Sequence, residues 1–129
     1  MNAGLTSKCG IAILALAVFA SGCSYKVDKG GDAKATLLQG QTLSFSVIRD
    51  VIIAPKCFQC HLGSGGQGGL DLSTYTSLVA NRMFVAGDPA NSDIFIQVNS
   101  GQMPFGQAKL SAIEIQAIHD WIEQGALEN

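Results

Sequence analysis

Five consecutive residues constrain the fold of this 129-residue chain more than any other feature. They are Cys57, Phe58, Gln59, Cys60 and His61. Two cysteines one helical turn apart, followed directly by a histidine, form the sequence to which c-type haem is attached. Each thiol can add to one vinyl group of the porphyrin, and the adjoining histidine then lies beneath the iron as its proximal ligand. The motif therefore predicts one covalent haem c, held by Cys57 and Cys60, with His61 as an iron ligand.

Two other kinds of site use the same pair of cysteines. A thioredoxin-like redox centre requires a β–α–β unit around the pair, and no strand-like alternation follows residue 44. A zinc knuckle requires a second pair of ligands. Apart from Cys9 and Cys23 near the N-terminus, the chain offers only His119 for that role. Haem attachment is thus the interpretation that the sequence favours.

The first 22 residues have the order of a secretory signal peptide. Lys8 is their single charge, an apolar run covers residues 11–20, and small residues precede Cys23. The run is too short to span a bilayer, which takes about 20 apolar residues. The final Ser-Gly-Cys resembles a bacterial lipobox, which predicts a lipid on Cys23. Ordinary signal cleavage at the same place, with Cys23 left as a free thiol, is the alternative.

The exported part is expected to contain a tether and one domain. Residues 23–43 begin with the lipidated cysteine, are polar and lack periodicity, which predicts a flexible tether. Residues 44–129 are long enough for one small domain. The chain has 8 Lys and Arg against 10 Asp and Glu, a net charge of -2. This balance excludes the basic surface of a nucleic-acid-binding protein.

Apolar residues recur at helical spacing in four parts of the domain, namely residues 44–53, 73–80, 90–100 and the segment after Ser111. Pro55 is expected to end the first helix just before the haem motif. Ser111 and Glu114 have the form of a capping box, and Gly125 is expected where the last helix ends. The sequence therefore predicts an all-α fold with three or four short helices around the haem.

A low-spin electron carrier needs a second axial iron ligand, and the sequence outside the motif offers three methionines and one histidine. Met103 lies in a loop bounded by Gly101 and Pro104, so its thioether is placed to close over the open haem face. Ligation by Met and His raises the reduction potential. Met83 is expected in the pocket wall or the core. His119 is expected on the polar face of the last helix, in solvent.

A series of short segments extends over most of residues 45–127. They are the haem motif, Gly69-Leu70-Asp71-Leu72-Ser73-Thr74-Tyr75, Gly87-Asp88-Pro89, Met103-Pro104, Leu110-Ser111 and Trp121-Ile122-Glu123-Gln124-Gly125-Ala126. Together they resemble the planctomycete-type cytochrome c domain, a small class I c-type domain. The resemblance implies a monohaem domain that serves electron transfer, and Gly-x-Met-Pro resembles the distal-ligand segment of class I cytochromes c. It leaves the redox partner open.

These observations predict an electron-transfer protein rather than an enzyme. We expect a membrane-anchored periplasmic or cell-surface cytochrome, with His61 and Met103 ligating an iron that cycles between Fe(II) and Fe(III). We also expect a monomer that meets its redox partner proteins through small, transient contacts and binds no nucleic acid. Two alternatives stay open. A haem-based peroxidase or gas sensor would have an open sixth site, and a structural lipoprotein would carry the motif incidentally.

Overall fold

The computed structural model describes residues 31–128, and within this range the regular structure is entirely helical, without a strand. The predicted all-α fold is therefore confirmed. The signal peptide, Cys9 and Cys23 lie outside the described residues, so cleavage and lipidation stay predictions. Between residues 31 and 128, none of the helices combines the length and the apolar character needed to cross a bilayer.

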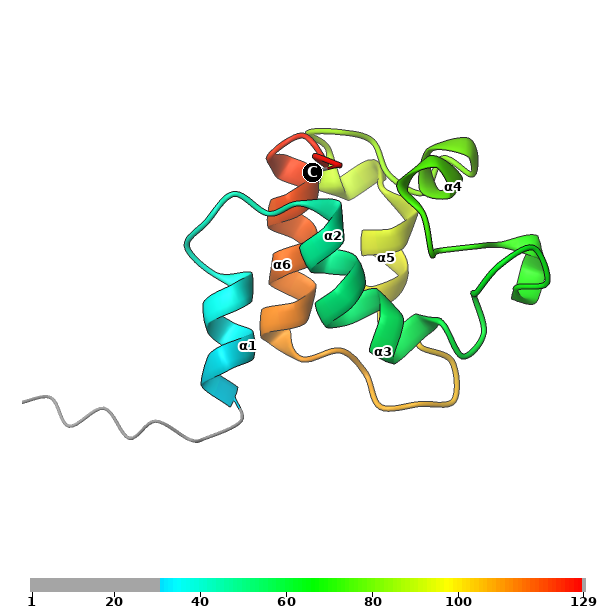
Figure 1. The fold of residues 1–129 in the computed structure, drawn as a ribbon, viewed down its shortest axis with the longest axis horizontal. Coiled ribbons are helices and arrows are strands. Elements are labelled where there is room, and N and C mark those ends of the chain that lie inside the picture. Colours follow the sequence, from blue (N-terminus) through cyan, green and yellow to red (C-terminus); the bar gives the residue numbers. More distant parts are fainter. Residues whose placement is uncertain (1–30, 129) are drawn as a thin grey trace, which may run out of the picture.

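Helix α6 (Ala112–Glu123) is the longest of the described helices and forms the centre of the fold (Figure 1). It contacts α1 (Gly31–Leu38), α2 (Phe45–Ile48) and α5 (Asp93–Asn99). The apolar residues that it buries are Ala117, Ile118, Trp121 and Ile122. Because these residues recur at spacings of three and four, they form one stripe along the helix that faces the surrounding elements.

Both predicted ends of α6 are confirmed. The hydroxyl of Ser111 accepts a hydrogen bond from the backbone N–H of Glu114, whose carboxylate accepts one from the backbone N–H of Ser111 at 2.7 Å. This reciprocal pair is a capping box. At the other end Gly125 has φ +101°, which few other residues adopt. The amide of Ala126 then donates to the carbonyl of Trp121 at 2.8 Å and closes the helix.

The prediction that Pro55 ends the first helix is wrong. Helix α2 continues through a wide π-helical turn, η1 (Arg49–Ile53), into α3 (Ala54–Cys57). In the wide turn the amide of Ala54 donates to the carbonyl of Arg49, five residues back. Pro55 thereby occupies the first turn of α3, where its missing N–H is tolerated. The helix is not broken and runs directly into the haem motif.

The predicted tether also differs from the structure over part of its length. Residues 31–38 form α1, which lies beside α6 (Figure 1). Leu38 and Leu43 are each only 2% exposed and belong to the core. Lys34 forms an ion pair with Glu114 on α6. A segment that buries so few apolar side chains does not show helical periodicity in its sequence, which is why it was expected to be a tether.

The other predicted helices are present. Residues 73–80 contain α4 (Tyr75–Ala80), and residues 90–100 contain α5, preceded by the short turn η3 (Pro89–Asn91). A second short turn, η2 (Gln67–Gly69), lies in the glycine-rich loop that follows the haem motif. In Figure 1 this loop lies on the side of the molecule opposite α1.

Four aromatic rings form a separate part of the core. They belong to Phe45, Tyr75, Phe84 and Trp121, with centroid distances of 5.1 to 6.1 Å between neighbours. The hydroxyl of Tyr75 donates to the carbonyl of Ala126 at 2.9 Å, and the indole N–H of Trp121 donates to that of Leu127 at 2.9 Å. The cluster therefore fastens α2, α4 and α6 together and satisfies its polar atoms within the protein.

Candidate functional site

The haem motif begins on the last residue of α3 and continues as one more helical turn. The backbone amides of Cys60 and His61 both donate to the carbonyl of Cys57, at 3.1 and 2.9 Å. The two cysteines and the histidine are therefore carried by a single turn whose position is fixed by the helix before it. All three side chains are partly buried.

A cavity of about 640 Å³ lies against this turn. The predicted ligands Cys57, Cys60, His61 and Met103 all line it. The other lining residues are Lys56, Gln67, Gly68, Leu70, Leu72, Met83, Asp93, Ile94, Gln97, Val98, Pro104, Phe105 and Gln107. Its volume lies inside the range of about 300 to 1,000 Å³ that is typical of cofactor sites, and its lining combines an apolar wall with a few polar groups.

The chain that follows α5 places Met103 in the wall of this cavity. Gly101 follows the helix with φ +72°, and the chain reverses there. The amides of Gln102 and Met103 both donate to the carbonyl of Gln97 at 3.1 Å, which holds the reversed chain against the helix. A methionine directly after such a helix end has a defined position even though it lies in a loop. The structure thus brings Met103 and His61 to one cavity from segments 42 residues apart.

Two backbone hydrogen bonds hold the glycine-rich loop against the haem motif. The amide of Gln67 donates to the carbonyl of Cys60 at 2.7 Å, and the amide of Leu72 donates to the carbonyl of His61 at 2.9 Å. At Gly66 the backbone passes so close to the carbonyl oxygen of Leu70 that an added Cβ would overlap it. The loop is therefore a folded part of the site wall, and at least Gly66 is required for its path.

The environment of Cys57 does not suit a thiol that works as a redox nucleophile. Burial is the main reason that the pKa of the Cys57 thiol is raised to about 11, and the neighbouring Cys60 and Glu114 add to the effect, whereas Lys56 opposes it. Thioredoxin-like centres instead depend on a lowered thiol pKa. The structure therefore favours a cysteine that serves as an attachment point over a thioredoxin-like pair.

His61 carries an unsatisfied buried atom. Among the described side chains, its Nδ1 is the one buried nitrogen or oxygen without a hydrogen-bond partner. Buried polar atoms without partners are rare and call for an explanation. One explanation is that a bound group, and not a hydrogen bond within the protein, sets the position of the His61 ring. Two thiols, an imidazole and a thioether around one apolar cavity form the donor set of a haem c, so the residues present fit this cofactor.

The two remaining predicted positions, Met83 and His119, lie in different environments. Met83 lines the cavity and also packs on the core. His119 is not among the cavity residues; its side chain is 32% exposed, lies 3.1 Å from the carboxylate of Asp120 and packs edge-on against Phe95. Several cavity residues had no signal in the sequence, because single polar residues in a loop or on a helix carry no motif. They are Lys56, Asp93, Gln97 and Gln107.

Comparison with known families agrees with this site. Residues 57–104 match the family described as planctomycete cytochrome C. The match includes the whole haem motif, the glycine-rich loop and Met103. No match was found among curated proteins or among solved structures. The family implies a covalently bound haem and electron transfer through it. Residues 57–104 are thus similar to c-type cytochromes of the planctomycete type.

Proposed function

We propose that the protein is a monohaem electron carrier, not an enzyme. Cys57 and Cys60 hold the haem through thioether bonds, and His61 and Met103 are its axial ligands. The observation that carries the proposal is the convergence of these four side chains on one cavity of suitable size. When bound, the haem supplies a one-electron couple between Fe(III) and Fe(II).

The residues around the cavity suit this role because elements with defined hydrogen bonds hold the two iron ligands in place. His61 stands on a turn fixed by α3, and Met103 is fixed by the two hydrogen bonds to Gln97. Ligands held by rigid elements keep the reorganisation on electron transfer small. Leu70, Leu72 and Ile94 make part of the wall apolar, which excludes water and favours the less charged reduced state.

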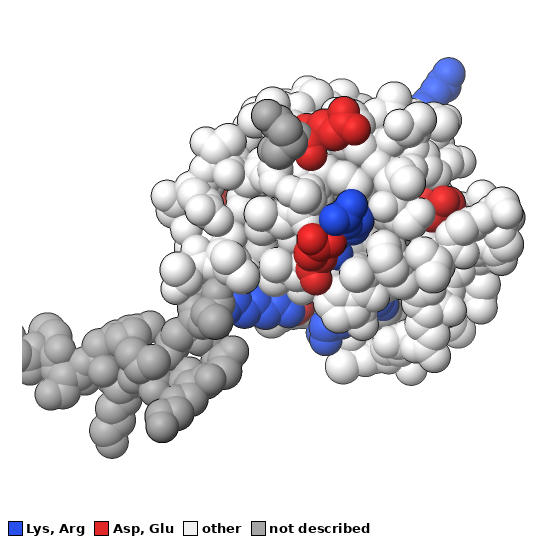
Figure 2. Space-filling model, in the orientation of Figure 1, with Lys and Arg blue, Asp and Glu red and all other residues white. Residues whose placement is uncertain are grey.

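The partners are proposed to be other redox proteins, met transiently by a monomer. On the face drawn in Figure 2, charged side chains are few and of both signs, with no large region of one sign. Such a face gives little long-range attraction for a strongly charged partner. A small contact beside the cavity, of the kind typical of redox encounters, is sufficient.

The protein is further proposed to be exported and held at a membrane by a lipid on Cys23, in the periplasm or at the cell surface. The support is the order of charge, apolar run and small residues before Cys23. Labelling with a radioactive fatty acid tests the anchor. Wild type is expected to be labelled and Cys23→Ser unlabelled, and an unlabelled wild type would contradict lipidation.

The function is tested with protein produced together with a haem-attachment system. Wild type is expected to keep haem stain after denaturing electrophoresis, and the double variant Cys57→Ser, Cys60→Ser is expected to lose it. In its visible spectrum, Met103→Ala is expected to lose the methionine-to-iron charge-transfer band. A wild type without stain would contradict the haem. A high-spin wild-type spectrum without that band would favour the peroxidase or gas-sensor alternative.

A further inference from the structure

Three side chains near the end of α6 form a cluster of metal-binding donors that the haem site does not use. His119, Asp120 and Glu123 each offer one nitrogen or oxygen atom, and these atoms lie within 4.8 Å of one another. Nδ1 of His119 lies 3.1 Å from the carboxylate of Asp120 and 3.9 Å from that of Glu123. In a tetrahedral zinc site with bonds of about 2.1 Å, neighbouring ligand atoms are about 3.4 Å apart. The donors thus lie near the spacing that one ion imposes, and the side chain of Glu123, which is 66% exposed, can rotate to close the gap.

The helix and its neighbours hold two of these donors in place. His119 and Glu123 are four residues apart and Asp120 and Glu123 are three apart, the spacings at which side chains meet on one face of a helix. The side-chain amide of Gln116, one turn earlier, donates to the carboxylate of Asp120 at 2.7 Å. A hydrogen bond of this kind orients a carboxylate that binds metal. The ring of Phe95 on α5 packs edge-on against the imidazole of His119, with 5.3 Å between the ring centroids, and limits its rotation.

The two carboxylates of the cluster are short of positive partners. Within the described part of the chain, the ion pairs of Asp120 and Glu123 are with His119 alone. Its imidazole is charged only when it is protonated. When the ring is neutral, two negative charges therefore lie beside it without a paired cation. A divalent metal ion would compensate both charges and use the imidazole nitrogen as a third ligand.

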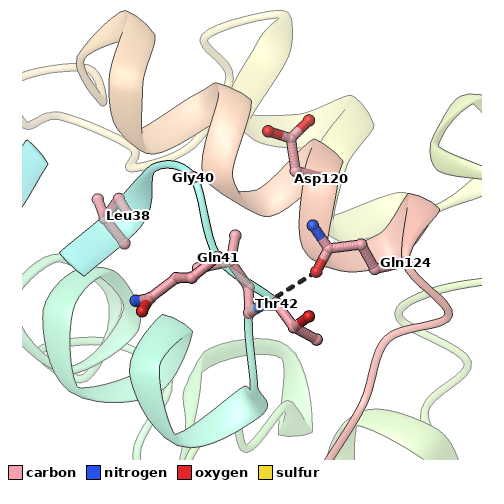
Figure 3. A pocket seen from close by; sticks show the side chains of 7 residues that line it. Leu38, Gly40, Gln41, Thr42, Asp120 and Gln124 are labelled. Atoms are coloured by element: carbon pink, nitrogen blue, oxygen red, sulfur yellow. Dashed lines mark hydrogen bonds between the residues drawn. The ribbon is translucent and has the colours of Figure 1, made fainter. Parts of the chain in front are cut away.

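Solvent reaches the cluster. The side chains of His119 and Asp120 are 32% and 37% exposed. Asp120 also lines an open hollow of about 530 Å³ between α6 and the turn that follows α1 (Figure 3). The amide of Leu43 donates to the side-chain oxygen of Gln124 at 2.8 Å, the bond drawn as a dashed line, and holds this turn against α6. An ion has a path to the cluster, and water has room beside it to complete the coordination.

We infer that His119, Asp120 and Glu123 bind a divalent transition-metal ion such as zinc at the surface of α6. An imidazole with two carboxylates is a donor set that suits zinc, whereas magnesium and calcium prefer oxygen ligands alone. Three protein ligands leave one position of a tetrahedral zinc ion for water. The neutral imidazole binds through Nδ1 and keeps its proton on Nε2. The inference does not depend on the proposed function, because none of the three residues lines the haem cavity.

The test is a calorimetric titration of the haem-loaded full chain with zinc. Haem attachment occupies both cysteines of the haem motif and His61, so His119 is the one histidine left to bind added metal. Wild type is expected to bind one zinc ion per chain. Gln116→Leu is expected to bind zinc about tenfold more weakly, because loss of a group that orients a ligand costs about 10–100-fold in affinity. His119→Ala and Glu123→Gln each lose a ligand and are expected to bind zinc more weakly by at least about tenfold.

Asp50→Asn is the matched control. Asp50 is an exposed carboxylate paired with Arg49, so its loss removes the same unit of charge outside the cluster. This variant is expected to bind zinc like wild type, and magnesium at equal concentration is not expected to displace the zinc. Equal zinc affinities in wild type, His119→Ala and Glu123→Gln would overturn the inference, and so would displacement by magnesium. Haem stain reports on the proposed function separately. If His119→Ala fails to fold, Glu123→Gln, changed at an exposed position, decides alone.

Discussion

Gln107 donates a hydrogen bond from its side-chain nitrogen to the side-chain oxygen of Gln59 at 2.9 Å. Gln59 lies between the two cysteines of the haem motif, and Gln107 lies four residues after Met103. The bond therefore connects the segment that carries His61 with the loop that carries Met103. It lies at the edge of the cavity, which Gln107 lines.

Gln107→Ala is expected to make the sixth position of the iron easier to reach. Loss of one hydrogen bond of about 1 kcal/mol corresponds to about a fivefold change in an equilibrium constant. Imidazole should bind the oxidised variant with affinity up to about fivefold higher than wild type, measured by spectral titration. Gln102→Ala, at an exposed position one residue before Met103, is the control and should bind like wild type. Equal affinities in all three proteins would mean that the bond does not restrain the loop.

Gly66→Ala is expected to destabilise the protein, because the new Cβ would overlap the carbonyl oxygen of Leu70. Relief of such a clash requires the backbone to move and costs about 1–3 kcal/mol. The neighbouring Gly65 has no atom within 4 Å of an added Cβ and no positive φ, so Gly65→Ala should change the free energy of unfolding by less than about 1 kcal/mol. Urea unfolding of both variants measures the difference. Two equal losses would contradict the close approach at Gly66.

Arg82→Gly is expected to stabilise the protein by about 0.5–1 kcal/mol, because Arg82 has φ +54° at the end of α4, a conformation that glycine adopts without strain. The amide of Arg82 donates to the carbonyl of Val79, and that of Met83 donates to the carbonyl of Leu78, both at 3.0 Å. Glycine keeps both bonds. Thermal unfolding should show a higher midpoint.

Ala126 provides the contrast for Arg82. It also has a positive φ, +52°, but its side chain is fully buried. Ala126→Gly removes a buried methyl group, which costs about 0.8 kcal/mol and offsets the relief of strain. Its unfolding midpoint should therefore stay near that of wild type. A clearly higher unfolding midpoint for Ala126→Gly, together with an unchanged midpoint for Arg82→Gly, would contradict this account.

Acid should destabilise the protein partly through Glu114. Burial alone would raise the pKa of Glu114, but hydrogen bonds from Lys34 and Ser111 outweigh it and hold the pKa below the usual value of 4.5. A carboxylate with a lowered pKa contributes stability that is present above 4.5 and is lost as the pH falls through the folded-state pKa. Wild type should therefore lose stability below about pH 4.5.

Glu114→Gln separates this contribution from that of the other carboxylates. At pH 7 the variant should be less stable than wild type by about 1–3 kcal/mol, the usual worth of hydrogen bonds to a charged group. Below pH 4.5 the gap should narrow, because protonation removes the same charge from wild type. Unfolding free energies measured from pH 7 to pH 3 test this. If the unfolding free energies of wild type and Glu114→Gln fell in parallel over the whole pH range, the loss of stability in acid would come from other groups.

Local sequence patterns predicted the elements that are stabilised locally. The capping box of Ser111 and Glu114 depends on four consecutive residues, and the haem motif depends on five, so each is complete within a short segment. The end of the helix at Pro55 was predicted wrongly for the opposite reason. Whether a proline breaks a helix depends on the turn before it, and the wide turn η1 carries no recognisable pattern.

Long-range packing accounts for the rest. The docking of α1 depends on Leu38, Leu43 and Lys34, which pack against distant parts of the chain. Lys34, for example, pairs with Glu114, which lies 80 residues later in the sequence. Among the aromatic residues, Phe84 packs on both Tyr75 and Trp121, while Phe105 lines the cavity. Hydrophobicity predicts that such side chains are buried, but it does not say which neighbours bury them.

The start of α2 and the residues after α6 also meet. The amide of Phe45, at the start of α2, donates to the carbonyl of Leu127, beyond the end of α6, at 2.8 Å. The chain therefore enters and leaves this unit at one point. A unit with adjoining ends can be placed within a surface loop of another polypeptide without stretching either end. Residues 45–127 thus have the geometry of an insert, and a host protein that received them in a surface loop would have to cover the apolar surface that Leu38 and Leu43 cover in this chain.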